Sequence, residues 1–427
     1  MQLRRVAETV PSCFDEVSGT EMFFFLTLGV SAGVLYAVSQ YVLLQLLLAG
    51  AMLFAAIKNP FYCLGVYMTT SIYISEIYPG IVHVGLLALI CISFFFHNIS
   101  VINRLMNGSL LIFSFLMILA SYLLGFESKL TTGILLFLCV LIYVLVVNNY
   151  HSSKLGVVVW AIICGAIGVS IYLLMKSASG SVTKFGRLSF EGDIKTVSVI
   201  MVTPMMLLLI SRLTSYKTIR NLDNPLFEWV CIAVFGVVLI LTVARGIMIA
   251  AAIGVLFSLF LARNKMKWLQ QIIPIVALVF VFIMLNIDSE EFRISRLFET
   301  EEYTDMNGRT DIWFDFVKDI VKRGPASILF GIGPGSVSRI SEDGLYSHST
   351  YLDYFFSYGS AGLLWIFVFT VNVVSKVWQS KIAPLICLLC ASIIMYMTHG
   401  SAANVEMYII QGLLVATVTR KNNKCRT

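Results

Sequence analysis

Long apolar runs alternate with short polar segments along almost the whole chain. The runs are roughly 16 to 25 residues long, which is the length that a helix needs to cross a hydrocarbon layer of about 30 Å. The pattern predicts fourteen membrane-spanning helices, of which the third and the last are interrupted by polar residues. They are expected near residues 22–38, 41–57, 61–78, 80–96, 107–125, 131–147, 155–175, 194–211, 226–243, 246–262, 269–285, 349–374, 382–398 and 404–419.

One polar interval in this pattern is much longer than the others. Residues 286–348 contain 12 of the 24 acidic residues and 7 of the 30 basic ones. Connections of this length inside a compact protein usually have a function, so we expect the interval to form part of an active site. It divides the chain into an N-terminal membrane bundle (1–285), a large loop (286–348) and a C-terminal part with further spans and a basic tail (349–427).

The composition agrees with a membrane protein. The chain is 58% hydrophobic and 13% charged, with a mean hydropathy of +0.88, whereas a soluble domain is about half apolar and about a quarter charged. We therefore predict an all-α, polytopic integral membrane protein with about 12 to 14 spans. The net charge of +6 does not indicate a nucleic-acid partner, because most of the basic residues lie in short connections between apolar runs. The long loop contains no cysteine, so no disulfide framework is expected there.

The positions of lysine and arginine predict the orientation of the helices. With both chain ends in the cytoplasm, the inner segments contain 17 of these residues, and the short outer segments contain 6. Short cytoplasmic loops carry such an excess, so we expect both termini inside and the long loop outside. The first apolar run, which begins at Met22 and leads into further spans, is expected to be an anchor and not a cleaved signal peptide.

The long loop should contain an amphipathic helix that begins near Gly308 and ends at Gly324. At 100° per residue, its apolar residues cover one broad face and its charged residues a narrow arc. Such a helix is expected to lie in the membrane interface with Trp313 toward the lipid. The aspartates at 311, 315 and 319 are either a catalytic row or a solvated face paired with Lys318 and Lys322 at i+3, and the second interpretation is favoured.

Two further features follow this helix. The segment from Gly331 to Gly335 follows no predicted strand, so it is not a dinucleotide fingerprint. It indicates a turn at which the backbone approaches a ligand or a neighbouring helix. His348 ends the loop, and a lone histidine at a membrane edge is often structural. Arg245 and Arg309 are predicted on the same side of the membrane as His348. A role of His348 as a general base is therefore also open.

Arg245 lies between two apolar runs that are joined by almost no loop. An arginine costs about 2.5–3.5 kcal/mol at the centre of a membrane helix and less near its edge. One interpretation is a side chain that reaches the outer surface. The other is an anion site, because a guanidinium binds phosphate oxygens through two parallel hydrogen bonds. Arg187, in the polar loop 176–193, is either an interface anchor or a further cation.

Taken together, these motifs resemble the O-antigen ligase/polymerase superfamily of bacterial membrane glycosyltransferases. Ser349 stands where that family often has asparagine, and the N-terminal half of the chain is similar only as a run of spans. The resemblance is carried by Thr242–Arg245, by Gly308–Trp313 with the spacing Gly-Arg-x-x-x-Trp, by Gly331 and Gly333 with the spacing Gly-x-Gly, and by His348–Gly362.

The resemblance implies a membrane-embedded fold similar to the GT-C glycosyltransferases, in the bacterial inner membrane with the long loop in the periplasm. The implied reaction transfers a sugar, with inversion, from an undecaprenyl-pyrophosphate-linked oligosaccharide to an acceptor hydroxyl, without a metal or another cofactor. Membrane lipid and a chain-length regulator are the implied partners. The implied substrate-binding residues are Arg245, Arg309, Arg187, Trp313, Gly331 and Gly333, and His348 is the implied base, with Arg245 and Arg309 stabilising the leaving diphosphate.

Three functions remain open at this point. A polymerase that joins repeat units is favoured, because the loop from Arg309 to His348 is compact. A ligase would use the same chemistry to transfer the glycan to lipid A-core. A transporter or flippase would need charges at mid-membrane, and the spans offer few of these, chiefly Glu406.

Overall fold

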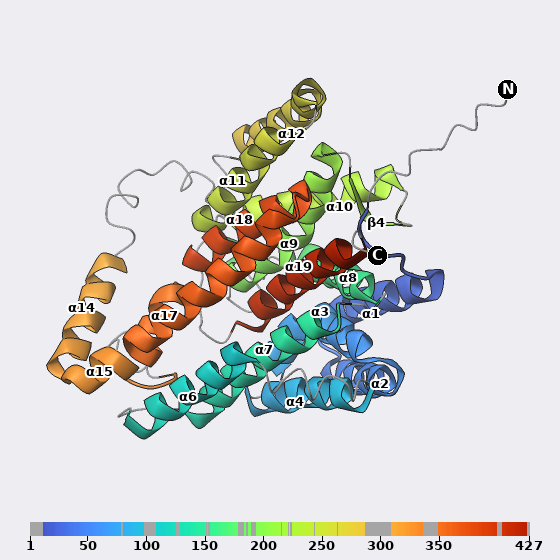
Figure 1. Ribbon diagram of the computed structural model, residues 1–427. Helices are drawn as coiled ribbons and strands as arrows, with labels where there is room; N and C mark the ends of the chain where they lie inside the picture. Colours follow the sequence, from blue (N-terminus) through green and yellow to red (C-terminus); the bar gives the residue numbers. More distant parts are fainter. Residues whose placement is uncertain are drawn as a thin grey trace.

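Figure 1 shows the computed structural model of the protein, and the elements are labelled in chain order. The structure is 87% helical, with sixteen α-helices in the part that it describes, so the prediction of an all-α membrane protein is confirmed. The described residues are 12–77, 80–97, 108–124, 129–150, 152, 154–177, 183–184, 187–188, 194–214, 216–220, 222, 224–242, 244–262, 264–286, 309–335, 349–398 and 404–424.

The helices follow one another with short connections. The first group is α1 (Gly19–Ala37), α2 (Tyr41–Lys58), α3 (Pro60–Ile77), α4 (Gly80–His97), α6 (Ser109–Leu124), α7 (Leu130–Asn148) and α8 (Leu155–Ser177). The second is α9 (Ile194–Leu213), α10 (Pro225–Leu241), α11 (Arg245–Leu261) and α12 (Lys265–Asn286). The last is α14 (Arg309–Lys322), α15 (Pro325–Phe330), α17 (Thr350–Gln379), α18 (Ala383–Thr398) and α19 (Val405–Lys424). Two short pairs of strands complete the fold, β1 (Ser12–Phe14) with β4 (Lys217–Ile219) and β2 (Thr183–Lys184) with β3 (Arg187–Leu188).

Each of the fourteen predicted spans coincides with a helix. Six of these helices, α1, α2, α4, α7, α8 and α17, are long and apolar enough to cross a membrane. Shorter apolar stretches lie in five more helices, namely α6, α9, α10, α11 and α18. Many large apolar side chains on them are exposed, among them Phe96 at 80% and Phe260 at 74%. Apolar surface of this extent on a helical bundle is expected to face lipid.

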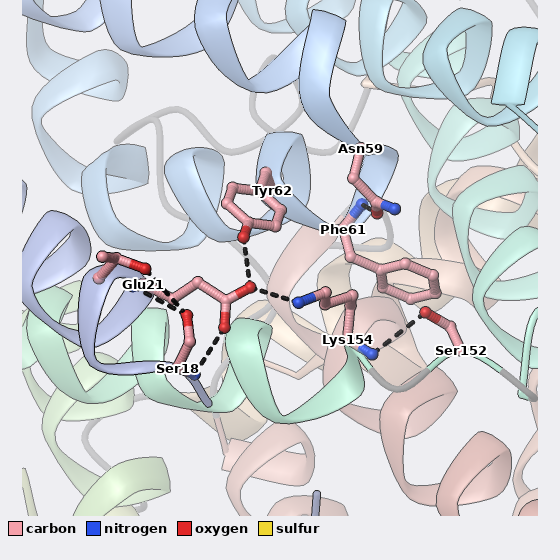
Figure 2. A network of polar contacts seen from close by, with 8 residues as sticks. Ser18, Glu21, Asn59, Phe61, Tyr62, Ser152 and Lys154 are labelled. Carbon is pink, nitrogen blue, oxygen red and sulfur yellow. Dashed lines mark hydrogen bonds and ion pairs between the residues drawn. The ribbon is translucent and has the colours of Figure 1, made fainter. Parts of the chain in front are cut away.

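A buried polar network ties three helices together at one end of the bundle (Figure 2). The Glu21 carboxylate, in the first turn of α1, accepts hydrogen bonds from the Tyr62 hydroxyl and from Lys154 Nζ, the latter at 2.5 Å. It also accepts one from the Ser18 backbone N–H at 2.7 Å, and the Ser18 side chain caps α1 in return. A buried carboxylate needs such partners, so the network fixes the ends of α1, α3 and α8 to one another.

The same end of the bundle carries further ion pairs. Arg212 pairs with Glu228, and the C-terminal helix is attached through Arg420, which contacts Asp15. The parallel pairing of β1 with β4 lies here as well. Glu228 is near the start of the predicted span 226–243, and the other residues named here belong to segments that are predicted to be cytoplasmic. The alternation of the helices is therefore consistent with these contacts, while the side of the membrane that this end faces remains a prediction.

Helix α17 is broken at Gly359, where φ is 65° and ψ is −157°. The Tyr354 ring stacks on Trp365, with 5.4 Å between the ring centroids and 14° between the planes, and the Tyr351 side chain hydrogen-bonds Thr370. In a straight helix Tyr354 and Trp365 would be about 16 Å apart along the axis. Residues 350–358 thus fold back along residues 360–379, so the structure divides the predicted span 349–374. Only its second part is long enough to cross a membrane.

Candidate functional site

Helices α14 and α15 lie against the folded end of α17, on the side away from the chain's C-terminus (Figure 1). A small apolar core of their own, separate from that of the bundle, holds them there; it consists of Phe316, Ile320, Ile332 and Phe356. Phe316 is 2% exposed and stacks on Phe356 with 4.7 Å between the ring centroids. The loop helix is therefore part of the folded protein and is anchored to the helix that follows the loop.

The apolar face of α14 is divided between this core and the surface. Phe316 and Ile320 are buried, whereas Phe314 is 65% exposed and Val321 is 59% exposed. Trp313, which the resemblance assigns to substrate binding, is half-buried on the same helix. The exposed half is the part of the helix that an interfacial position would place in lipid.

The acidic side of α14 is a paired surface in the part that the structure describes. Asp315 lies 3.6 Å from Lys318, the predicted i+3 partner. Asp319 binds Arg323 at 2.9 Å and an i+4 spacing, instead of the predicted Lys322. Arg323 follows the last helical residue, where its side chain can turn back to the preceding turn. These contacts support the interpretation of a solvated face.

The glycine loop after α15 approaches a neighbouring helix, which is one of the two arrangements that the sequence indicates. The backbone N–H of Ile332 donates to Phe356 O at 2.9 Å, and that of Gly333 donates to Ser357 O at 3.1 Å. Both acceptors lie in the turns of α17 just before its break. A Cβ on Gly331 would come within 2.4 Å of the Ser357 carbonyl carbon, so only glycine fits there.

The other face of this loop is held by α6 and α7. Ser121 Oγ donates to Phe330 O at 2.7 Å, and the Lys129 backbone N–H donates to Pro334 O at 2.7 Å. Gly331, Gly333 and Gly335 all have positive φ angles. The loop thus joins the Gly359 break of α17 to α6 and α7 in one closely packed corner, which contains Gly331 and Gly333.

Arg245 is the first residue of α11 and is partly buried. Helix α11 packs along α18, where a Cβ on Gly254 would touch Ala391. The two helices are antiparallel, because Phe257 near the end of α11 contacts Trp378, just before α18 begins. From the rise per residue of an α-helix, Arg245 lies about 13 Å from Gly254 along the axis of α11, toward the start of that helix. This places it level with the end of α18.

An apolar groove of about 610 Å³ opens between α17 and α18 at this level. Its lining includes Tyr351, Leu363, Phe367, Thr370, Ile393 and Met397. Tyr351 is two residues beyond Ser349, which is buried at the start of α17. The groove therefore connects the lateral surface of the bundle with the segment that directly follows His348.

Several of the predicted site residues cannot be placed together. His348 lies outside the described residues, and for Arg309 and Arg187 only the backbone is described, as the first residue of α14 and of β3. Within the described part, no three His, Cys, Asp or Glu side chains could jointly hold a metal ion. The meeting of Arg245, Arg309 and His348 therefore stays a prediction, and so does the absence of a metal from the reaction.

Glu406 is not among the predicted site residues and entered the prediction only as a charge that a transporter would use. The structure places Glu406 in the first turn of α19, close to Tyr396 near the end of α18. The interruption of an apolar run by one carboxylate was the only signal in the sequence, and it does not reveal which side chains surround it.

Comparison with known proteins supports the resemblance. No curated protein matches the chain. Residues 230–367 match a family model described as O-antigen ligase. The matched segment runs from α10 into α17 and includes the three motifs around Arg245, Arg309 and Gly331, as well as His348. This match supports the assignment of residues 230–367 to the O-antigen polymerase/ligase superfamily.

Proposed function

We propose that this protein is an O-antigen polymerase. It joins undecaprenyl-pyrophosphate-linked repeat units at the periplasmic face of the inner membrane, by inverting and metal-independent glycosyl transfer. The match over residues 230–367 supports an enzyme of O-antigen processing in general. The observation that supports the proposal is the corner between Gly331, Gly333 and Gly359, which joins the Gly-x-Gly motif to the start of α17.

In the proposed reaction, the acceptor hydroxyl attacks C1 of the donor sugar from the side opposite the diphosphate. The bond from C1 to the diphosphate oxygen breaks, and its electron pair stays on that oxygen. His348 takes the proton of the acceptor hydroxyl. Arg245 and Arg309 stabilise the charge that grows on the leaving group. Arg245 is also the first residue of α11, so the positive end of the helix dipole lies beside it and favours an anion further.

The groove between α17 and α18 suits the lipid part of the donor. Its lining is apolar and opens toward the side of the bundle, while Tyr351 at one edge lies next to the start of α17. An isoprenoid chain in the groove would remain in contact with the bilayer, and its diphosphate would lie at the level of Arg245. The substrate would thus enter from the membrane and not from water.

A ligase is the second candidate, because the family model that matches residues 230–367 is described as O-antigen ligase. A ligase would transfer the finished glycan to lipid A-core. A transporter is the third, since Glu406 lies among the helices.

Deleting the gene and separating the lipopolysaccharide on a gel distinguishes the three. Core with a single repeat unit supports the polymerase. Bare core, with polymer accumulating on the lipid carrier, supports the ligase. Bare core without polymer on the lipid carrier supports the transporter. Purified enzyme that remains fully active in EDTA supports the metal-independent reaction, and loss of activity that added metal restores contradicts it.

A further inference from the structure

Helix α14 has three different surfaces, whereas a simple amphipathic helix has two. At about 100° per residue, its described side chains fall into three sectors around the helix. Phe316 and Ile320 form the buried sector, which faces the small core with Phe356. The next sector is apolar but exposed, and the third carries exposed charges. The exposed apolar sector consists of Phe314, Val317 and Val321, and the charged sector consists of Asp315, Lys318 and Lys322.

The next helix adds to the exposed apolar sector. Helices α14 and α15 meet at Gly324, and Ile328 and Leu329 of α15 are exposed as well. Five large apolar side chains of these two helices are therefore exposed. We call them the loop surface, which consists of Phe314, Val317, Val321, Ile328 and Leu329. Exposed apolar surface of this kind marks a contact with another protein or with a membrane.

A contact with α6 fixes the depth of α15 in the molecule. Ser121 Oγ donates to Phe330 O at 2.7 Å. Ser121 lies only about 5 Å along the helix axis before Leu124, the last residue of α6. Helix α15 therefore lies at the end of an apolar helix of the bundle, as Figure 1 also shows. This is the level at which the hydrocarbon layer of a membrane ends and the headgroup region begins.

Exposed apolar side chains flank this contact on both helices. Tyr122, which follows Ser121 on α6, is 41% exposed, and Leu329, which precedes Phe330 on α15, is 52% exposed. In a polytopic membrane protein, the exposed apolar side chains of a helix such as α6 face lipid. The loop surface thus lies beside a surface that lipid already covers.

The boundary of a bilayer suits all three sectors of α14 at once. A helix in this position has its apolar side about 5–10 Å deep in the lipid and its charged side in water, while the buried sector stays on the protein. A fully aqueous position would instead leave the loop surface in water, which is unfavourable. Residues 309–323 contain four basic and three acidic residues, so their charges nearly cancel. Burial of apolar surface, and not attraction to anionic headgroups, should therefore stabilise the contact.

We propose that α14 and α15 form an interfacial membrane anchor, in which the loop surface inserts into the phospholipid leaflet at this end of the bundle. Because α15 ends at Phe330 and Gly331 follows directly, the anchor also sets the depth of the glycine corner relative to the lipid. This inference goes beyond the proposed function, and it holds for a polymerase and for a ligase alike.

The test uses the full-length protein in phosphatidylcholine vesicles. A bimane fluorophore is attached to a Val321→Cys variant, and its fluorescence is quenched either by phospholipids with a nitroxide on the acyl chain or by iodide in water. We expect the lipid nitroxide to quench V321C at least about threefold more strongly than Lys322→Cys, because only the apolar side of an interfacial helix reaches the acyl chains. Iodide should show the reverse order. Added phosphatidylglycerol or salt should change neither result, because the contact is apolar.

Lys322→Cys is the matched control, because Lys322 is the next residue of the same helix and is exposed in the charged sector. Leu123→Cys on α6, where Leu123 is 70% exposed, reports full contact with lipid. The unsubstituted protein gives the background, since the described cysteines are buried apart from the half-buried Cys390. Ile328→Cys provides a second position on the loop surface if V321C does not keep the wild-type thermal stability, and it should behave like V321C.

Two outcomes would overturn the anchor. Equal quenching of V321C and K322C by iodide would show that the loop surface lies in water. Protection of V321C from both quenchers would show that protein covers the loop surface, either a second copy of this chain or another protein. Neither outcome bears on the proposed glycosyl transfer, which is measured separately as polymer formation.

Discussion

At the scale of single residues, Arg245 shows how position gives a common side chain a specific role. It begins α11, is partly buried, and lies level with the end of α18. A guanidinium presents several N–H donors in a fixed plane and stays charged, whereas an ammonium is a compact charge that loses its proton more readily when buried. A diphosphate site should therefore need arginine here and not merely a positive charge.

Arg245→Lys is thus expected to lower polymer formation at least about tenfold, because one bidentate contact is worth more than about 1.4 kcal/mol. The measurement is the rate with lipid-linked repeat units at saturating and at limiting concentrations. Arg323→Lys is the control, since Arg323 forms a surface pair with Asp319 that lysine can preserve. Equal rates for R245K and the wild type would argue against a diphosphate contact at Arg245.

Gly331 is a second residue whose role follows from its surroundings. Its φ of 78° and the 2.4 Å approach to the Ser357 backbone both exclude a side chain. Gly331→Ala should therefore destabilise the corner by more than the 1–2 kcal/mol that positive φ alone costs. Gly324→Ala is the matched control, because Gly324 has a φ of 95° but open space around it. A thermal-shift assay that finds equal stability for the two variants would contradict the close packing.

At the scale of elements, α14 and α17 contain most of the structural features that the sequence does not predict. The sequence indicates an amphipathic helix over α14 because its apolar residues recur at helical spacing, and that helix is present. It does not indicate which half of the apolar face is buried, because this depends on the position of Phe356 in a distant helix. The sequence does not predict the break in α17 either. Gly359 occurs in an otherwise helical pattern, and an isolated glycine is tolerated in such a pattern.

The pair Phe316 and Phe314 tests the packing of α14. Phe316→Ala should cost about 3–5 kcal/mol, because a ring that is 2% exposed leaves a cavity against Phe356. Phe314→Ala removes a ring that is 65% exposed and should leave the protein stability unchanged. Limited proteolysis within residues 286–348 reports whether α14 is detached. Similar protection of both variants would contradict the second core.

At the scale of the whole molecule, the contacts sort the helix ends into two groups. One group contains the Glu21 network and the pairs of Arg212 and Arg420. The other contains the glycine corner, α14 and α15. The lysine and arginine count assigns the first group to the cytoplasm, because short basic loops are retained on that side. The groove and Arg245 lie toward the second group.

A membrane-impermeant maleimide can test this orientation. The described cysteines are buried, apart from the half-buried Cys390, so the background should be low. Lys322→Cys on α14 is expected to react in cells whose outer membrane alone is permeabilised, because its side chain is exposed. Lys58→Cys at the end of α2, also exposed, should react only after lysis. The reverse pattern would place the candidate site in the cytoplasm and overturn the proposed function.

The sequence by itself determined the helical membrane architecture, the order of the spans and the presence of a helix inside the long loop. These features follow from hydrophobic periodicity and length, which are local properties of the chain. The resemblance to the O-antigen polymerase/ligase superfamily was also visible in the sequence, because its motifs follow one another in order along the chain. Only the tertiary structure decided that the Gly331 loop donates its N–H groups to α17, that α17 folds back at Gly359, and that Phe316 stacks on Phe356. Such contacts join residues far apart in sequence, and their energies depend on burial and distance, which a linear pattern does not contain.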